Sequence, residues 1–145
     1  MTPKIIYMTN IDRRYFMMRR ALDELIADGE MSASSQVVKT EDSSVWSASW
    51  EEKLRGSALV MIRFMGNRIR TKFWTACMHF LSREGIPYYM DAAGSAEEEC
   101  VERVAAKDIE AMKAYSFYGG LTNYKNLWLY ARSLFDQGAP NAEPP

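Results

Sequence analysis

Four short apolar stretches of this chain have the pattern of buried strands. Residues 4–9 (KIIYMT) are rich in β-branched and aromatic side chains, and residues 57–65 (SALVMIRFM) are apolar on both faces. A strand that is apolar on both faces is typical of the centre of a parallel sheet. Residues 36–40 and 86–91 are the other two candidates. The pattern therefore predicts a sheet of about four strands.

The first two segments between these strands have helical periodicity. One begins after a polar turn at residues 10–12, where Asp12 is expected to cap the helix, and it ends at Gly29. Its apolar residues fall on one face, namely Tyr15, Met18, Leu22, Leu25 and Ile26. Ser43 or Ser44 is expected to cap a short second helix. That helix carries Trp46, Trp50 and Leu54.

Three further helices are predicted later in the chain. One follows the basic loop of residues 66–70 and buries Trp74, Cys77, Met78 and Leu81. The next starts at a capping box formed by Ser95 and Glu98 and continues over residues 101–115. Two glycines at residues 119–120 are expected to end it in left-handed backbone, and Asn123 to cap the last helix. The apolar face of that helix is Tyr124, Leu127, Trp128, Ala131, Leu134 and Phe135.

The alternation of strands and helices predicts the fold class. Strand, helix and strand in succession imply a parallel sheet with right-handed crossovers and helices on both faces. We expect a flavodoxin-like or Rossmann-like three-layer α/β sandwich with strand order 2-1-3-4. Residues 1–137 are interpreted as one domain, and the Pro-rich residues 138–145 as a linker or domain boundary.

Composition excludes several functional classes. A net charge of −1 gives no general attraction to nucleic acid or to a membrane surface, and no apolar run reaches the ~18 residues of a membrane span. Cys77 and Cys100 are too few and too far apart for a metal knuckle or a disulfide framework. The start of the chain lacks the order of a signal peptide. A reduced, cytoplasmic location is expected.

Common cofactor and catalytic motifs are not found in the sequence. No G-x-G-x-x-G turn or G-x-x-x-x-G-K-[ST] loop is present, and the turn T-N-I-D-R is unlike the phosphate loop that binds FMN in flavodoxins. The one histidine, His79, is expected on the polar face of its helix, away from Cys77. Neither a metal site nor a hydrolytic triad is therefore predicted, and no residue is assigned as catalytic.

Open α/β sheets bind ligands outside the carboxyl ends of their strands. In this chain, polar, basic and aromatic residues lie at or just after the carboxyl ends of the predicted strands, and so at one edge of the sheet. Arginine suits carboxylates and phosphates there because its planar fork can donate two parallel hydrogen bonds. The alternatives are a solvated basic face, a capping role for Asp12 and a core role for Trp74. The candidate contact residues are Asn10, Asp12, Arg63, Gly66, Asn67, Arg68, Lys72 and Trp74.

Several segments resemble the large subunit of ATP-dependent cobaltochelatase and its magnesium-chelatase relatives. KIIYMTNIDRRYFMMRRALDEL resembles the opening of that subunit, SALVMIRFMGNR its central strand and turn, and GIPYYMDAAG its next strand. The segment AYSFYGGLTNYKNLWLYA is the most specific, because two glycines and two asparagines recur at fixed spacing. The motif residues are Tyr118, Gly119, Gly120, Asn123 and Asn126.

The resemblance covers nearly the whole chain but only a small N-terminal part of that subunit. It implies a domain of a protein that binds a tetrapyrrole and inserts cobalt or magnesium, while separate motor subunits hydrolyse ATP. The expected partners are the remainder of the large subunit, the ATPase motor subunits and the tetrapyrrole. The alternative is a free-standing, non-catalytic binding or adaptor protein derived from this domain. In either case the chain itself holds no metal and no cofactor that we can assign.

Overall fold

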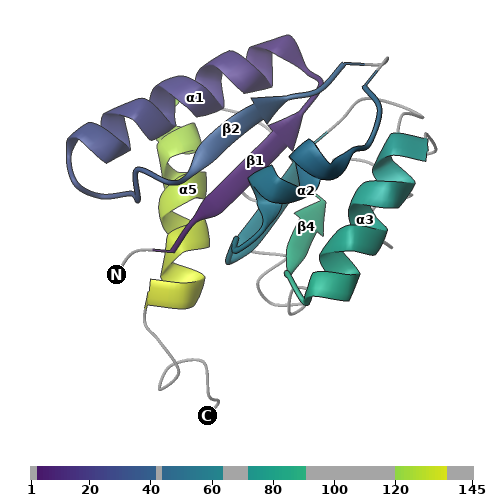
Figure 1. Ribbon diagram of the computed structural model, residues 1–145. Helices are drawn as coiled ribbons and strands as arrows, with labels where there is room; N and C mark the ends of the chain where they lie inside the picture. Colours follow the sequence, from purple (N-terminus) through teal and green to yellow (C-terminus); the bar gives the residue numbers. More distant parts are fainter. Residues whose placement is uncertain (1–2, 42–43, 64–71, 91–119, 137–145) are drawn as a thin grey trace.

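The computed structural model describes residues 3–41, 44–63, 72–90 and 120–136, in which strands and helices alternate (Figure 1). The strands and helices follow the expected order along the chain. Their bounds are β1 Ile5–Thr9, α1 Asp12–Ala27, β2 Gln36–Lys39, α2 Ala48–Leu54, β3 Leu59–Arg63, α3 Lys72–Glu84, β4 Tyr88–Met90 and α5 Leu121–Asp136.

The strands form one parallel sheet in the order β2-β1-β3-β4. β1 is central, and its last residue, Thr9, is paired in register with Lys39 of β2 and Arg63 of β3. Every residue of β1 is buried, as are the first four of β3. This confirms the predicted α/β class and the position of the first strand between the second and the third.

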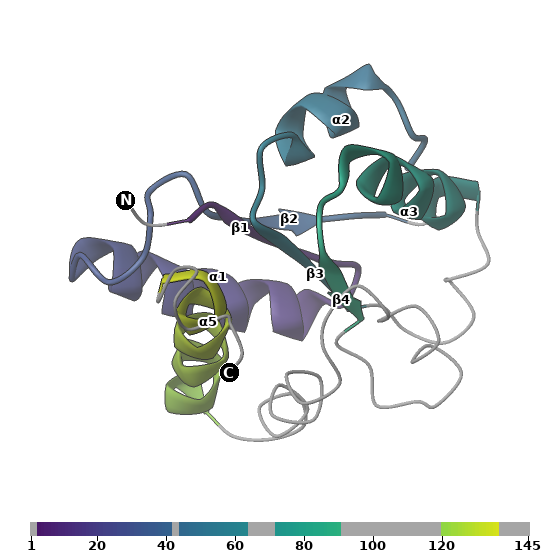
Figure 2. The ribbon, with the colours of Figure 1, turned by 90° about the horizontal axis from the view of Figure 1, so that it is seen from below.

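Helices cover both faces of the sheet. Figure 2 shows α1 and α5 on one face and α2 and α3 on the other. The predicted apolar face of α5 is confirmed, because Tyr124, Leu127, Trp128 and Ala131 are buried. The indole nitrogen of Trp128 donates a hydrogen bond to the carbonyl of Met18 at 3.0 Å and so joins α5 to α1.

The ends of α1 differ in how well they match expectation. Asp12 is not the cap: the N-cap residue is Ile11, without a side-chain cap, and Asp12 is the first residue of the helix. The C-terminal end matches the prediction. Gly29 has φ of 77° and donates to the carbonyl of Ile26 at 3.0 Å, while Glu30 donates to that of Leu25 at 2.7 Å. This pair of bonds is a Schellman motif, which requires the left-handed residue that glycine supplies.

The second helix begins later than predicted. Its N-cap residue is Ser47, so Trp46 lies just before the helix. Ser44 closes a turn instead, since its hydroxyl accepts a hydrogen bond from the backbone N–H of Glu41 at 3.0 Å. Ser43 lies outside the described residues. The expectation that Ser43 or Ser44 would cap the helix is therefore wrong for Ser44, whose side chain is used in the turn.

The last helix begins earlier than predicted. The carbonyl of Gly120 accepts the backbone N–H of Asn123 at 3.0 Å, so Asn123 lies inside the first turn and is not the cap. Gly120 does not have a positive φ. Gly119, the predicted capping box of Ser95 and Glu98, the helix over residues 101–115 and the linker at 138–145 lie outside the described residues.

Candidate functional site

The carboxyl ends of three strands meet at one edge of the sheet. The register that pairs Thr9 with Lys39 and Arg63 places these residues, and Asn10 after β1, along that edge. Asn10 and Arg63 are half-buried, and each already interacts with neighbouring groups. Two of the predicted contact residues therefore lie where open α/β sheets bind their ligands.

A hydroxyl group shapes the turn between β1 and α1. The Oγ1 atom of Thr9 accepts a hydrogen bond from the backbone N–H of Ile11 at 3.1 Å. The carbonyl of Ile11 then accepts the N–H of Tyr15 at 2.9 Å, which begins the helix. Asp12 is left with an exposed carboxylate, which pairs with Lys39 of β2. Its side chain thus forms an ion pair and takes no part in capping.

Lys39 is the centre of a small charged cluster at the same edge. Its ammonium nitrogen lies 2.6 Å from the carboxylate of Asp12 and 3.4 Å from that of Glu41. It also lies over the ring of Tyr15, 5.9 Å from the centroid. The hydrogen bond with Asp12 is the main cause that raises the pKa of Lys39, and partial burial opposes it. Both Asp12 and Lys39 are therefore occupied with each other.

Thr40, which follows β2, is a residue of this edge that sequence reasoning missed. It is 2% exposed, and its backbone N–H donates to the carbonyl of Thr9 at 2.9 Å. Its Oγ1 atom has no hydrogen-bond partner among the described residues. A buried hydroxyl without a partner is costly, so Thr40 needs a hydrogen-bonding group that the described residues do not supply. Threonine at the end of an apolar strand gives no such signal in a sequence.

The other predicted contact residues are only partly described. Lys72 is the first residue of α3 and is exposed. Trp74 is 3% exposed, with its ring against Phe73 at a centroid distance of 5.2 Å. That burial supports a core role for Trp74. The loop residues Gly66, Asn67 and Arg68 lie outside the described residues.

The residues of the glycine–asparagine motif are likewise only partly among the described residues. Gly120 and Asn123 form the first turn of α5, and Asn126 lies exposed one turn later. Tyr118 and Gly119 lie outside the described residues. The described part of the motif thus starts the helix that packs on α1, which gives it a structural role.

Nucleophilic and metal chemistry find little support in the described ranges. Burial raises the pKa of the Cys77 thiol to about 12, which leaves it protonated and unreactive at neutral pH. His79 lies exposed on α3, on the polar face of the helix as expected. No group of three His, Cys, Asp or Glu side chains suited to a metal ion occurs in the part of the chain that is described. None of the helices there has the length and apolar composition that crossing a bilayer requires.

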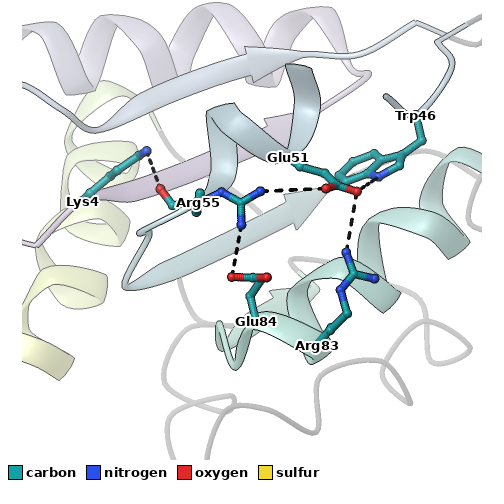
Figure 3. Close-up of polar contacts among 6 residues, drawn as sticks. All are labelled: Lys4, Trp46, Glu51, Arg55, Arg83 and Glu84. Carbon is teal, nitrogen blue, oxygen red and sulfur yellow. Dashed lines mark hydrogen bonds and ion pairs between the residues drawn. The ribbon is translucent and has the colours of Figure 1, made fainter. Parts of the chain in front are cut away.

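A second polar cluster joins α2 to α3, as Figure 3 shows. The carboxylate of Glu51 accepts a hydrogen bond from the indole nitrogen of Trp46 at 3.0 Å. It also lies 3.9 Å from Arg55 and 3.7 Å from Arg83, and Arg55 in turn lies 3.4 Å from Glu84. All these charges have partners, so the cluster joins two helices and offers no vacant binding group.

The carboxyl edge is therefore the better candidate site. It combines the guanidinium of Arg63, the amide of Asn10 and the buried hydroxyl of Thr40. All three side chains can donate hydrogen bonds, and arginine matches a carboxylate in charge and shape. Such an edge is suited to holding an anionic ligand.

Comparisons with known proteins relate the chain to one solved structure. No family model and no curated protein matches it. The catalytic subunit of cobaltochelatase from Mycobacterium tuberculosis matches in structure, with a TM-score of 0.67 and 18% sequence identity. The match covers 99% of this chain and 11% of that one. At this identity the likeness establishes a shared fold over nearly the whole of this chain. The matched region is only a small part of the cobaltochelatase subunit.

Proposed function

We propose that this chain acts as an N-terminal domain of a cobaltochelatase-like large subunit. The observation that carries the proposal is the structural match to a cobaltochelatase subunit over 99% of the chain. The sequence segments that resemble the same family support it independently. In this proposal the complete domain has a flavodoxin-like three-layer arrangement. The whole cytoplasmic complex inserts cobalt or magnesium into a tetrapyrrole, and separate motor subunits hydrolyse ATP.

The domain is proposed to contact the tetrapyrrole at the carboxyl edge of its sheet. A corrinoid or porphyrin ring carries carboxylates at its rim, and Arg63, Arg68 and Lys72 are three of the four cations at or shortly after the end of β3 in the sequence. Asn10 and Thr40 lie at the same edge and add hydrogen-bond donors. The domain then positions the ring, while the residues that hold the metal during insertion belong to the remainder of the subunit.

Binding of a metal-free porphyrin dicarboxylate tests this role directly. Titration of the chain with that porphyrin should quench its tryptophan fluorescence with a saturable curve. Arg63→Ala and Arg68→Ala should each weaken binding about tenfold or more, because a hydrogen bond to a charged group contributes about 1.5–3 kcal/mol. Arg83→Ala is the matched control, since Arg83 lies at the far end of α3 and should leave binding unchanged.

If the wild type and both edge variants bind the porphyrin equally well, the proposed tetrapyrrole contact at this edge is wrong. The size of the protein in its source cells separates the two remaining interpretations. An immunoblot band far above 16.7 kDa would support a domain of a large subunit. A band near that mass, with no association with chelatase motor subunits, would support a free-standing adaptor instead.

A further inference from the structure

One side of strand β2 has no neighbouring strand among the described residues, because β2 is at the edge of the sheet. The backbone N–H of Thr40 points to β1, where it donates to Thr9 at 2.9 Å. Backbone groups alternate in direction along a strand, so those of Val38 also face β1 while those of Val37 and Lys39 point outward. Val37 and Lys39 therefore present two donors and two acceptors to an incoming strand.

A groove lies beside this edge on the face covered by α1. Its volume is about 370 Å³, and its lining is mixed: Leu22 and Ile26 of α1 and Val37 of β2 are apolar, whereas Ser35 and Gln36 are polar. Arg19 and Asp23 of α1 form its rim. A groove with a partly apolar lining next to an edge strand combines two features that stabilise association, namely burial of the apolar part of the lining and new backbone hydrogen bonds. We call β2, the groove and its rim the α1–β2 flank.

The usual protection of a strand edge is weak on this flank. Natural proteins often place a lysine on an edge strand, where its charge repels another strand. Here Lys39 is paired with two carboxylates, those of Asp12 and Glu41, so it does not present a bare positive charge. Phe16, on the same helix one turn before Arg19, is 65% exposed and adds apolar surface near the groove. The repulsion that an unpaired lysine would give an incoming strand is therefore missing on this flank.

The rim charges favour one particular partner, a second copy of the chain. Asp23 makes no ion pair with a described residue, and the side-chain contacts of Arg19 within the described ranges are to Tyr15. The two rim residues are four apart on α1, about 6 Å along the helix axis. If a two-fold axis passes between them, Arg19 of each copy faces Asp23 of the other, as an isologous interface requires.

We propose that the α1–β2 flank pairs with the same flank of a second copy to form a symmetric dimer. The two β2 strands run antiparallel, with Val37 opposite its counterpart, so the sheets of the two copies join into one. Both α1 helices then lie on the same face of the joined sheet and close the groove between them. The interface is separate from the carboxyl edge, so the inference goes beyond the proposed chelatase role.

Sedimentation equilibrium of the purified chain, with charge-reversed variants, tests the dimer. The wild type should have twice the mass of 16.7 kDa at micromolar concentration. Arg19→Glu and Asp23→Arg should each weaken dimerisation at least tenfold, because each brings like charges together. An equimolar mixture of the two variants should restore dimers, since the glutamate introduced in one copy then faces the arginine introduced in the other. Arg13→Glu is the matched control on another side of α1 and should leave the dimer unchanged.

Val37→Pro provides a second test through the backbone. Proline removes the outward N–H of Val37 but leaves the bonds of β2 to β1 in place. It should abolish dimers while the circular dichroism spectrum stays that of the wild type. A monomeric wild type at 100 μM would overturn the proposal. Dimers that persist in Arg19→Glu, or a mixture that does not recover, would place the contact on another surface.

Discussion

The two helical layers of this domain are stabilised in different ways. The layer of α1 and α5 buries its contacts: Met18, Leu127, Trp128 and Ala131 are fully covered, and the Trp128 indole bonds to a backbone carbonyl of α1. Its ion pairs, such as Lys125 with Glu24 at 2.6 Å, lie at the outer margin. This layer is an extension of the core.

The layer of α2 and α3 uses half-buried aromatic rings and charges. Trp46 and Trp50 stack at a centroid distance of 6.3 Å, and both contact Phe73. Arg55 and Arg83 lie 5.4 and 5.5 Å from the ring of Phe80. The ring of Phe80 is buried beneath these cations, whereas the stacked rings of Trp46 and Trp50 remain half-buried.

The difference shows why α2 needs more than apolar burial. It has only seven residues, and Leu54 is its one fully buried side chain. A helix this short is not stable alone. The stacked rings and the Glu51 carboxylate attach it to α3, whereas α5, with sixteen residues, is held by ordinary core packing. We expect the two layers to respond differently to truncation, salt and pH.

The largest effect is expected from removing the ring of Trp128. Trp128→Ala should lower the free energy of unfolding by about 3–5 kcal/mol, because it leaves a cavity in a fully buried site. Urea denaturation followed by circular dichroism measures the loss. Should this variant fail to fold, Trp128→Phe, which keeps most of the ring volume, allows the same comparison. A loss below that of a surface substitution would contradict the core role of α5.

A smaller effect is expected in the other layer from Trp50→Ala. Trp50 is half-buried, so the change should cost about 1–2 kcal/mol, from one stacked and one edge contact plus part of the ring area. The same urea titration provides the measurement. A loss of unfolding free energy equal to that of Trp128→Ala would show that both layers depend equally on buried packing.

Glu51→Gln should show that the layer of α2 and α3 depends on charge, because the loss in unfolding free energy should depend on salt concentration. The amide keeps the size of the side chain and can still accept from Trp46, but it loses the attraction to Arg55 and Arg83. Because the pairs are partly exposed, the cost should be below about 1 kcal/mol. It should nearly vanish in 1 M salt, where the Debye length is only ~3 Å. If the loss of unfolding free energy persists at high salt, its cause is packing and not the ion pairs.

Lys125→Met should change how the free energy of unfolding depends on pH in the acidic range, by a still smaller amount. The hydrogen bond from Lys125 is the main cause that lowers the pKa of the Glu24 carboxyl. A lowered folded-state pKa stabilises the fold above the unfolded pKa, and this contribution disappears as pH falls through the lowered value. The wild type should therefore lose more stability than the variant on acidification below about pH 4.3. Matching pH profiles of the unfolding midpoint would show that the ion pair contributes nothing.

The strands were predictable because uniform apolar runs leave few alternatives for burial. The starts of the helices were less predictable, because α1 and α2 begin without a hydrogen bond from a capping side chain. Asp12, Ser44 and Asn123 were each expected to cap, and each lies one or more positions away from the cap that formed. A prediction from local sequence assumes that a polar side chain marks the first turn, and α1 and α2 do not use one.

The candidate site was predictable only through topology. Asn10 and Arg63 are far apart in the chain, and the order of parallel strands placed them at one edge before any contact was known. The partnerless hydroxyl of Thr40 and the Glu51 cluster were not predictable. Both depend on how neighbouring elements pack, and periodicity along one helix or strand carries no information on that.

The central position of β1 has a consequence for synthesis of the protein. β1 is made first, yet one of its two partners, β3, begins about 50 residues later. At a translation rate of roughly 5–20 residues per second, β1 waits roughly 3–10 s before that neighbour exists. During this interval a run of five apolar and β-forming residues has only β2 to pair with. The nascent chain is therefore a natural client for chaperones that bind extended apolar segments at the ribosome exit.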